Sequence, residues 1–178
     1  MIDIREVRTG DRHYEWIERL MHDAFPPDER RDIDAQRHNV DSEPRFHCCV
    51  AEDSGRPVGL FTYWDFGRFC YCEHFATDPE LRNQGYGCRV LRAVMERMAR
   101  PLVLEVEMPA DDLSRRRIGF YGRHGLRLWD AVGYVQPPYR TGGNELPMML
   151  MATEGLDPER DAAEVTRTLH RYVYGVER

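Results

Sequence analysis

Apolar positions in the first half of the chain change their spacing several times. Between residues 14 and 24 they recur every three or four positions, which predicts an amphipathic helix. Three apolar runs follow, at residues 46–51, 58–65 and 69–76, and turn-forming sequences separate them. Because short turns join neighbouring antiparallel strands, this order predicts a three-stranded antiparallel meander.

The other elements follow from the same periodicities. We expect a short strand over residues 1–8 and a second, more polar helix over residues 28–39. Farther along we expect a helix after residues 82–87, a strand over 102–107, a helix over 114–124, strands over 126–129 and 146–152, and a last helix starting at Asp157 and Pro158. The sequence therefore predicts a mixed α/β fold with a C-terminal helix, in which helices flank six to seven mostly antiparallel strands.

The length of the chain favours one domain. With 178 residues it can bury about 70% of its unfolded surface in a single core. No internal repeat and no linker marks a second domain. We expect a domain over residues 1–152 and a helical extension over residues 153–178 that packs on it. The apolar stripe of the last helix is also compatible with a homodimer interface, and the sequence leaves both alternatives open.

Composition and charge exclude several classes of protein. The chain is 42% hydrophobic and 31% charged, which is typical of a folded globular protein. Its 25 Lys and Arg against 31 Asp and Glu give a net charge of −6, which argues against nucleic-acid or anionic-membrane partners. No apolar run approaches the roughly 18 residues of a membrane-spanning helix, and the first residues do not resemble a signal peptide. We therefore expect a cytoplasmic protein.

The cysteines form no pattern typical of a zinc site or a disulfide framework. There are five, an odd number, and no pair of Cys-x-x-Cys motifs: Cys48, Cys49, Cys70, Cys72 and Cys88. In a cytoplasmic protein they stay thiols, and free cysteine is among the most buried residue types. We expect no metal site.

A glycine-containing loop between a predicted strand and a predicted helix carries the most specific chemistry. Its sequence is Arg82-Asn83-Gln84-Gly85-Tyr86-Gly87. A helix start offers unpaired N–H groups and a partial positive charge, and an arginine adds a bidentate donor, so the loop suits a phosphate. The residues that follow fit neither a Walker loop nor a dinucleotide fingerprint. Taken alone, the hexad also fits an ordinary helix start.

In its motifs the chain resembles the GNAT superfamily of N-acetyltransferases. Arg82-x-x-Gly85-x-Gly87 matches the family's acyl-CoA loop, Arg/Gln-x-x-Gly-x-Gly/Ala, and the strand at residues 71–76 precedes it at the expected spacing. Downstream, the sequences at residues 117–121 and 124–126 also match. The resemblance extends over about residues 3 to 152. It implies a splayed sheet in which acetyl-CoA lies between two strands.

The resemblance also implies the residues that bind acetyl-CoA. Backbone groups of Phe75, Ala76 and Thr77 would pair with the pantetheine arm. The pyrophosphate would be held by Arg82 and by the N–H groups of Asn83, Gln84, Gly85, Tyr86, Gly87 and Cys88. Many relatives carry an asparagine just after the strand that corresponds to residues 102–107, whereas this chain has Met108-Pro109 there. That contact is missing or replaced.

Acetyl transfer to an amine needs a base and an acid. An alkylamine with a pKa of about 10.4 is neutral in only about one molecule in 2,500 at pH 7, a cost of about 4.6 kcal/mol. Glu73, on the predicted strand beside the thioester, is the first candidate for the base, directly or through water. Glu105 and Glu107 share a face of a later strand and are alternatives. By similarity, Tyr121 is the acid that protonates the departing thiolate.

The sequence therefore predicts an acetyl-CoA-dependent N-acetyltransferase. The acceptor is the primary amine of a small molecule or a peptide, attacked directly in a ternary complex. Two alternatives remain open: a covalent route through Cys72 or Cys88, and a non-catalytic acyl-CoA sensor or interaction domain on the same fold. The acceptor, the acyl-chain preference and the oligomeric state do not follow from the sequence.

Overall fold

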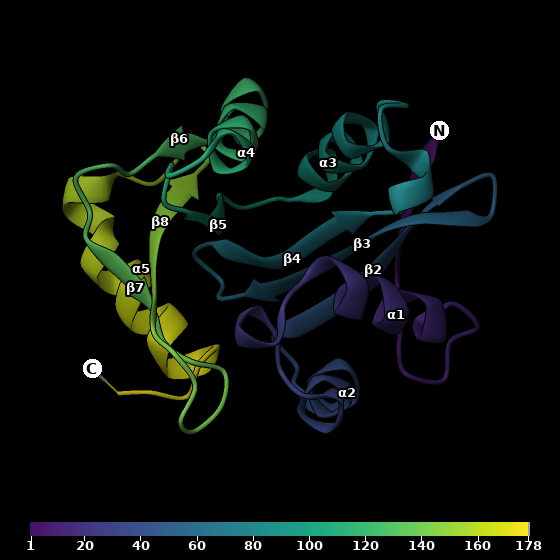
Figure 1. Ribbon diagram of the computed structural model, residues 1–178, viewed down its shortest axis with the longest axis horizontal. Coiled ribbons are helices and arrows are strands. Elements are labelled where there is room, and N and C mark those ends of the chain that lie inside the picture. Colours follow the sequence, from purple (N-terminus) through teal and green to yellow (C-terminus); the bar gives the residue numbers. More distant parts are fainter. Residues whose placement is uncertain (178) are drawn as a thin grey trace. The chain divides into compact units, whose positions relative to one another are not determined.

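A computed structural model of the protein describes residues 1–177 (Figure 1). Its strands are β1 (Ile2–Glu6), β2 (Phe46–Asp53), β3 (Arg56–Asp65), β4 (Cys70–Thr77), β5 (Leu102–Glu107), β6 (Arg127–Leu128), β7 (Tyr134–Gln136) and β8 (Leu146–Ala152). Its helices are α1 (Tyr14–Ala24), α2 (Ile33–Ser42), α3 (Tyr86–Arg97), α4 (Asp112–Arg123) and α5 (Pro158–Tyr172), with short 3₁₀ turns η1 (Pro27–Glu29) and η2 (Pro79–Leu81). The mixed α/β class and the C-terminal helix are confirmed.

The chain forms two compact units, Met1–Leu102 and Val103–Arg178. The first contains β1 to β4 with α1 to α3, and the second contains β5 to β8 with α4 and α5. The boundary that the sequence placed at residue 152 stays a prediction. Residue 178 of the expected extension lies outside the described residues.

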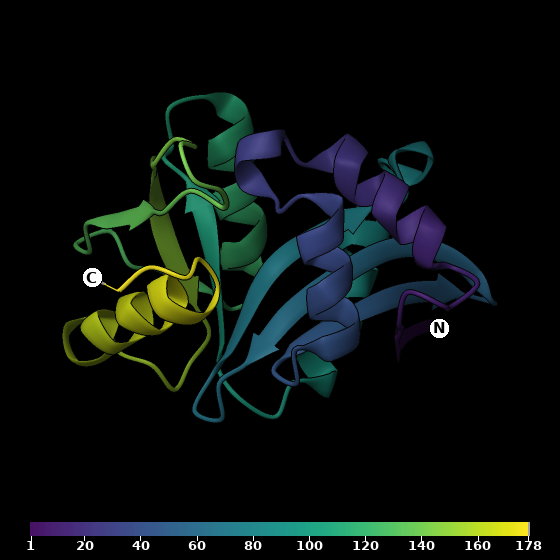
Figure 2. The ribbon, with the colours of Figure 1, turned by 90° about the horizontal axis from the view of Figure 1, so that it is seen from below.

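The first unit contains the predicted antiparallel meander. β2 pairs with β3 and β3 with β4, while β1 adds to the free edge of β2, all antiparallel. Helices α1 and α2 cover one face of this sheet and α3 covers the other (Figures 1 and 2). The core lies between these layers, where the fully buried side chains include Val50, Leu60, Phe61, Val90 and Val94.

A β-bulge interrupts the pairing of β3 with β4. Thr62 lies opposite His74 and Tyr63 lies opposite Cys72, so Glu73 is the extra residue on β4. An extra residue in one strand breaks the strict alternation of side chains. As a result, the side chains of Glu73 and His74 both lie on the face of the sheet that carries Thr62.

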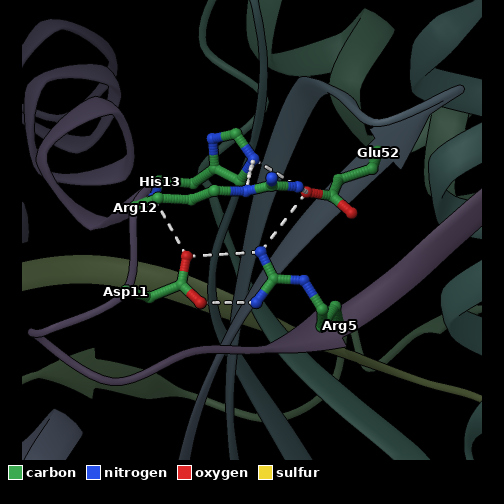
Figure 3. Close-up of polar contacts among 5 residues, drawn as sticks. All are labelled: Arg5, Asp11, Arg12, His13 and Glu52. Carbon is green, nitrogen blue, oxygen red and sulfur yellow. Dashed lines mark hydrogen bonds and ion pairs between the residues drawn. The ribbon is translucent and has the colours of Figure 1, made fainter.

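A network of charged side chains fixes the start of α1 to the sheet (Figure 3). Arg5 on β1 pairs with Asp11 at 2.5 Å and with Glu52 on β2 at 3.3 Å. Nε2 of His13, the residue before α1, lies 2.9 Å from the Glu52 carboxylate, which is largely buried. The loop between β1 and α1 is therefore held at both ends.

The second unit contains a strand that the sequence did not reveal. β5, β6 and β7 all pair with β8, each antiparallel. β7 lies within the expected loop over residues 130–145, and its three residues are too few to show a period. With β7, residues 1–177 contain eight strands, above the six to seven expected. β6 is also shorter than expected, with two residues.

The observed starts of α5 and α2 can be compared with the helix starts expected from the sequence. α5 begins as expected, because the Asp157 carboxylate accepts from the N–H groups of Glu159 and Arg160 at 3.0 and 3.2 Å. The helix expected over residues 28–39 is instead η1 followed by α2. The Asp32 side chain caps α2 by accepting from Ala35 N at 2.9 Å, which starts a new helix there.

Candidate functional site

The end of β4 leads directly into the glycine-containing loop. After Thr77 the chain turns at Asp78, whose backbone N–H donates to Val58 O at 2.9 Å. The Asp78 side chain accepts from Glu80 N at 2.9 Å and so caps η2. These contacts fix the direction in which the chain enters the loop at Arg82.

The backbone of the loop has the form of an anion site. Asn83 and Gly85 have φ values of 64° and 77°, in the left-handed region that favours glycine and tolerates asparagine. Gly85 is the N-cap of α3, so the N–H groups of the first helical turn, at Tyr86, Gly87 and Cys88, have no acceptor within the helix. Successive unpaired N–H groups at a helix start attract a phosphate.

Side chains anchor this loop to the end of β2. The Tyr86 hydroxyl donates to Asp53 Oδ2 at 2.9 Å, and Arg89 Nη2 donates to the same oxygen at 2.8 Å. The Arg89 guanidinium also lies 4.5 Å from the centre of the Tyr86 ring. The hydrogen bond from Arg89 is the largest cause that lowers the pKa of Asp53. The sequence did not indicate the contact between Asp53 and Arg89, because the two residues lie 36 positions apart along the chain.

All ten residues expected to bind acetyl-CoA lie in one continuous stretch of the first unit. Arg82, Asn83, Gln84, Gly85 and Cys88 are exposed, and Phe75, Ala76, Thr77, Tyr86 and Gly87 are half-buried. The stretch therefore offers both backbone groups and the Arg82 guanidinium to solvent, and these are the donors that a diphosphate needs.

Glu73 is not a solvated carboxylate. Its side chain has no exposed surface, and Arg31 Nη1 lies 2.5 Å from Oε1. The indole Nε1 of Trp64 donates to Oε2 at 3.0 Å. A carboxylate that is paired with arginine is a weaker base than an isolated one. The role of Glu73 as base stays a prediction, and no sequence pattern indicated that Arg31 contacts it.

The neighbouring His74 is also buried and bonded. Thr62 Oγ1 lies 3.2 Å from Nδ1, and Nε2 donates to the Glu29 carbonyl at 3.0 Å. The ring of Phe25 contacts it edge-on, with centroids 4.7 Å apart. Burial lowers the pKa of His74, so the imidazole stays neutral. Its contacts are those of a structural histidine.

The remaining candidates lie in the second unit. Tyr121, on α4, is 8% exposed. Glu105 accepts hydrogen bonds from the hydroxyls of Tyr134 and Tyr174, the latter at 2.8 Å to Oε2. Glu107 pairs with Arg117 at 2.8 Å. Each of the three carboxylates considered as the base, Glu73, Glu105 and Glu107, therefore has at least one polar partner. The tyrosines around Glu105 were not foreseen, because they come from β7 and from the segment after α5.

Over residues 1–177, no group of three or more His, Cys, Asp or Glu side chains is arranged to hold a metal ion. Within the same residues, none of the helices has the length and apolar character that a bilayer crossing requires.

Comparison with known proteins agrees with this geometry. Residues 11–126 match the sequence profile of the acetyltransferase (GNAT) family. A chain from Bacteroides thetaiotaomicron assigned to that family is 45% identical, with a TM-score of 0.96, and the match covers 98% of this chain and 99% of that one. No curated protein sequence matches.

Two more distant structures share the fold. A GNAT family acetyltransferase from Elizabethkingia anophelis, solved with acetyl-CoA bound, is 16% identical with a TM-score of 0.57, covering 86% of this chain and 97% of that one. The ribosomal-protein-S18-alanine N-acetyltransferase from Escherichia coli is 20% identical with a TM-score of 0.58, covering 88% and 99%. Together with the profile match and the Bacteroides relative, the geometry gives one conclusion: the chain belongs to the GNAT family of acyl-CoA-dependent acetyltransferases.

Proposed function

We propose that the protein transfers the acetyl group of acetyl-CoA to the primary amine of a small molecule or a peptide. The observation that supports the proposal is the loop over residues 82–88, where a left-handed Gly85, the N–H groups of the α3 start and an exposed Arg82 provide donors suited to a diphosphate. An E. anophelis relative is solved with acetyl-CoA, and an E. coli relative acts on an alanine of a ribosomal protein, which supports an amine acceptor.

In this proposal the first unit binds the cofactor. The N–H groups of residues 83–88 and Arg82 hold the diphosphate, and the backbone of Phe75, Ala76 and Thr77 pairs with the pantetheine arm. Preorganised backbone donors need no reorganisation when charge develops, so an N–H near Phe75 also stabilises the oxygen of the tetrahedral intermediate.

Acetyl transfer requires one group that protonates the departing thiolate and another that removes a proton from the amine. Tyr121 protonates the departing CoA thiolate, because a phenol with an ordinary pKa of about 10 is protonated at neutral pH. A carboxylate removes the proton of the amine, directly or through water. Glu73 stays the first candidate, with Glu105 and Glu107 as alternatives, and the partners of each carboxylate set its basicity.

Direct attack is favoured over a covalent cysteine intermediate. The Cys72 thiol is buried, and burial raises its pKa, so the nucleophilic thiolate is scarce. Cys88 is exposed on the first turn of α3, where the proposal places the diphosphate rather than the acetyl group. Exchange of label between acetyl-CoA and CoA without an amine would instead support the covalent route.

The test is turnover on a panel of amines. The purified protein with acetyl-CoA is expected to acetylate at least one small amine or peptide N-terminus, detected by mass spectrometry with a metabolite extract as the acceptor mixture. Binding of CoA without acetylation of any acceptor would favour the sensor alternative. The cytoplasmic location and the homodimer stay predictions.

A further inference from the structure

The connection between α1 and α2 contacts β4 through two consecutive strand residues. The Glu29 carbonyl accepts from His74 Nε2 at 3.0 Å, and Arg31 Nη1 lies 2.5 Å from Glu73 Oε1. The bulge at Glu73 makes this possible, because it brings both side chains to the face that α1 and α2 cover (Figure 2). The connection is therefore attached to β4 at two adjacent points.

The ion pair between Arg31 and Glu73 is buried. The Glu73 side chain has no exposed surface, and that of Arg31 is 7% exposed. Trp64 Nε1 donates to the second carboxylate oxygen at 3.0 Å, and the Arg31 guanidinium lies 5.5 Å from the centre of the Trp64 ring. Both carboxylate oxygens of Glu73 are thus held, one by a cation and one by a neutral donor.

A buried carboxylate depends strongly on its cation. Desolvation favours the neutral acid, whereas a cation in contact favours the anion. The titratable neighbours of Glu73 in the first unit include His74 and Cys72. Burial lowers the pKa of His74 and raises that of Cys72, so both stay neutral. Arg30 donates instead to the Phe25 carbonyl at 3.0 Å.

We propose that Arg31 is a positioning residue of the acetyl-transfer site, which keeps Glu73 ionised and holds the α1–α2 connection on β4. The pair lies just before the stretch Phe75–Thr77, which the proposed function assigns to the pantetheine arm. This inference rests on the proposed function, because acetyl transfer is the reaction that the positioning serves.

The ionisation of Glu73 can be followed without any substrate. Trp64 donates its indole N–H to Glu73, so the ¹H–¹⁵N signal of that indole responds when the carboxyl takes up a proton. The chain has three tryptophans, and Trp64→Phe identifies the signal. Between about pH 5 and 9 the wild-type signal is expected to stay constant, whereas in Arg31→Met it is expected to show one titration step. In Arg31→Met/Glu73→Gln the step is expected to vanish.

Turnover is the second readout. In Arg31→Met, kcat/KM for the acceptor is expected to fall about tenfold for each pH unit below the midpoint of the Trp64 titration. In the wild type this ionisation is expected to be absent from the range, so the step is expected in the ratio of the variant's kcat/KM to that of the wild type, in which the ionisation of the amine itself cancels. A merely structural role would lower activity equally at every pH. Arg31→Lys keeps a cation and is expected to restore a constant Trp64 signal.

A matched control removes an exposed ion pair that joins α1 and α2. Arg37 on α2 pairs with Glu18 on α1 at 2.8 Å, and the Arg37 side chain is 50% exposed. Arg37→Met is expected to leave both the Trp64 signal and the pH profile unchanged. If Arg31→Met does not fold, the wild type alone still tests the inference: the ¹³C signal of the Glu73 carboxyl is expected to stay that of a carboxylate down to about pH 5.

Three results would overturn the inference. The first is a Trp64 signal that does not titrate in Arg31→Met. The second is a kcat/KM of that variant that does not change at the midpoint of the Trp64 titration. The third is protonation of wild-type Glu73 above about pH 5. A different result is expected if the proposed function itself is wrong. In that case Trp64 titrates as expected, but the wild type acetylates no amine at any pH.

Discussion

The Tyr86 hydroxyl donates to the Asp53 carboxylate at 2.9 Å, which ties the start of α3 to the end of β2. Asp53→Ala removes the acceptor of both Tyr86 and Arg89. Without these two hydrogen bonds the loop is held less firmly, so KM for acetyl-CoA is expected to rise a few-fold with little change in kcat. Steady-state kinetics with varied acetyl-CoA measures this, and Asp3→Asn, on an exposed part of β1, is the control.

Arg82 is expected to contribute directly to cofactor affinity. A charge-assisted hydrogen bond to a phosphate contributes about 1.5–3 kcal/mol, so Arg82→Ala is expected to weaken CoA binding about 10- to 100-fold. Isothermal titration calorimetry measures the change. Arg92→Ala alters another exposed arginine on α3 and is expected to bind CoA like the wild type. Equal Kd values for the Arg82→Ala variant and the wild type would exclude Arg82 from the site.

Tyr121→Phe is expected to lower kcat while leaving the binding of acetyl-CoA intact. General acid catalysis contributes typically 10²- to 10⁴-fold, so a loss of about 100-fold is expected. Since Tyr121 is 8% exposed, thermal unfolding of the variant checks that the fold is kept. A well-folded variant with the kcat of the wild type would show that another group protonates the thiolate.

The network at the start of α1 makes stability depend on pH. The hydrogen bond from Arg5 is the main cause that lowers the pKa of Asp11 from 3.8 to about 2. A lowered carboxyl pKa stabilises the fold above the unfolded value, and this stabilisation is lost as pH falls from about 4 to about 2. Because the pair is partly exposed, Asp11→Asn is expected to cost about 1 kcal/mol at pH 7. Urea unfolding at several pH values measures it, and a difference that persists unchanged at pH 2 would contradict this.

The sequence predicted those parts of the site that depend on neighbouring residues. Arg82, Gly85 and Gly87 lie within six positions, so their spacing suggested a phosphate loop, and that role stays a prediction. The pair of Arg31 and Glu73 joins residues 42 positions apart through a bulge, and no local pattern indicates such a contact.

The same difference between local patterns and long-range contacts explains which elements of the fold were predicted. The long periodic helix α1 was predicted close to its observed bounds, and α3 and α5 were predicted close to their observed starts, since each shows an apolar stripe over three or more turns. β7 has three residues, and its pairing with β8 defines it as a strand. Tertiary contacts of this kind also bring Tyr134 and Tyr174 to Glu105, and no sequence pattern indicated these partners.

The proposed function depends on the binding of the coenzyme A diphosphate by main-chain N–H groups at the start of α3. A ¹H–¹⁵N spectrum of the labelled protein, titrated with CoA, tests it most directly. The largest shifts are expected on the backbone amides of residues 83–88. Absence of binding, or shifts confined to other parts of the chain, would contradict it.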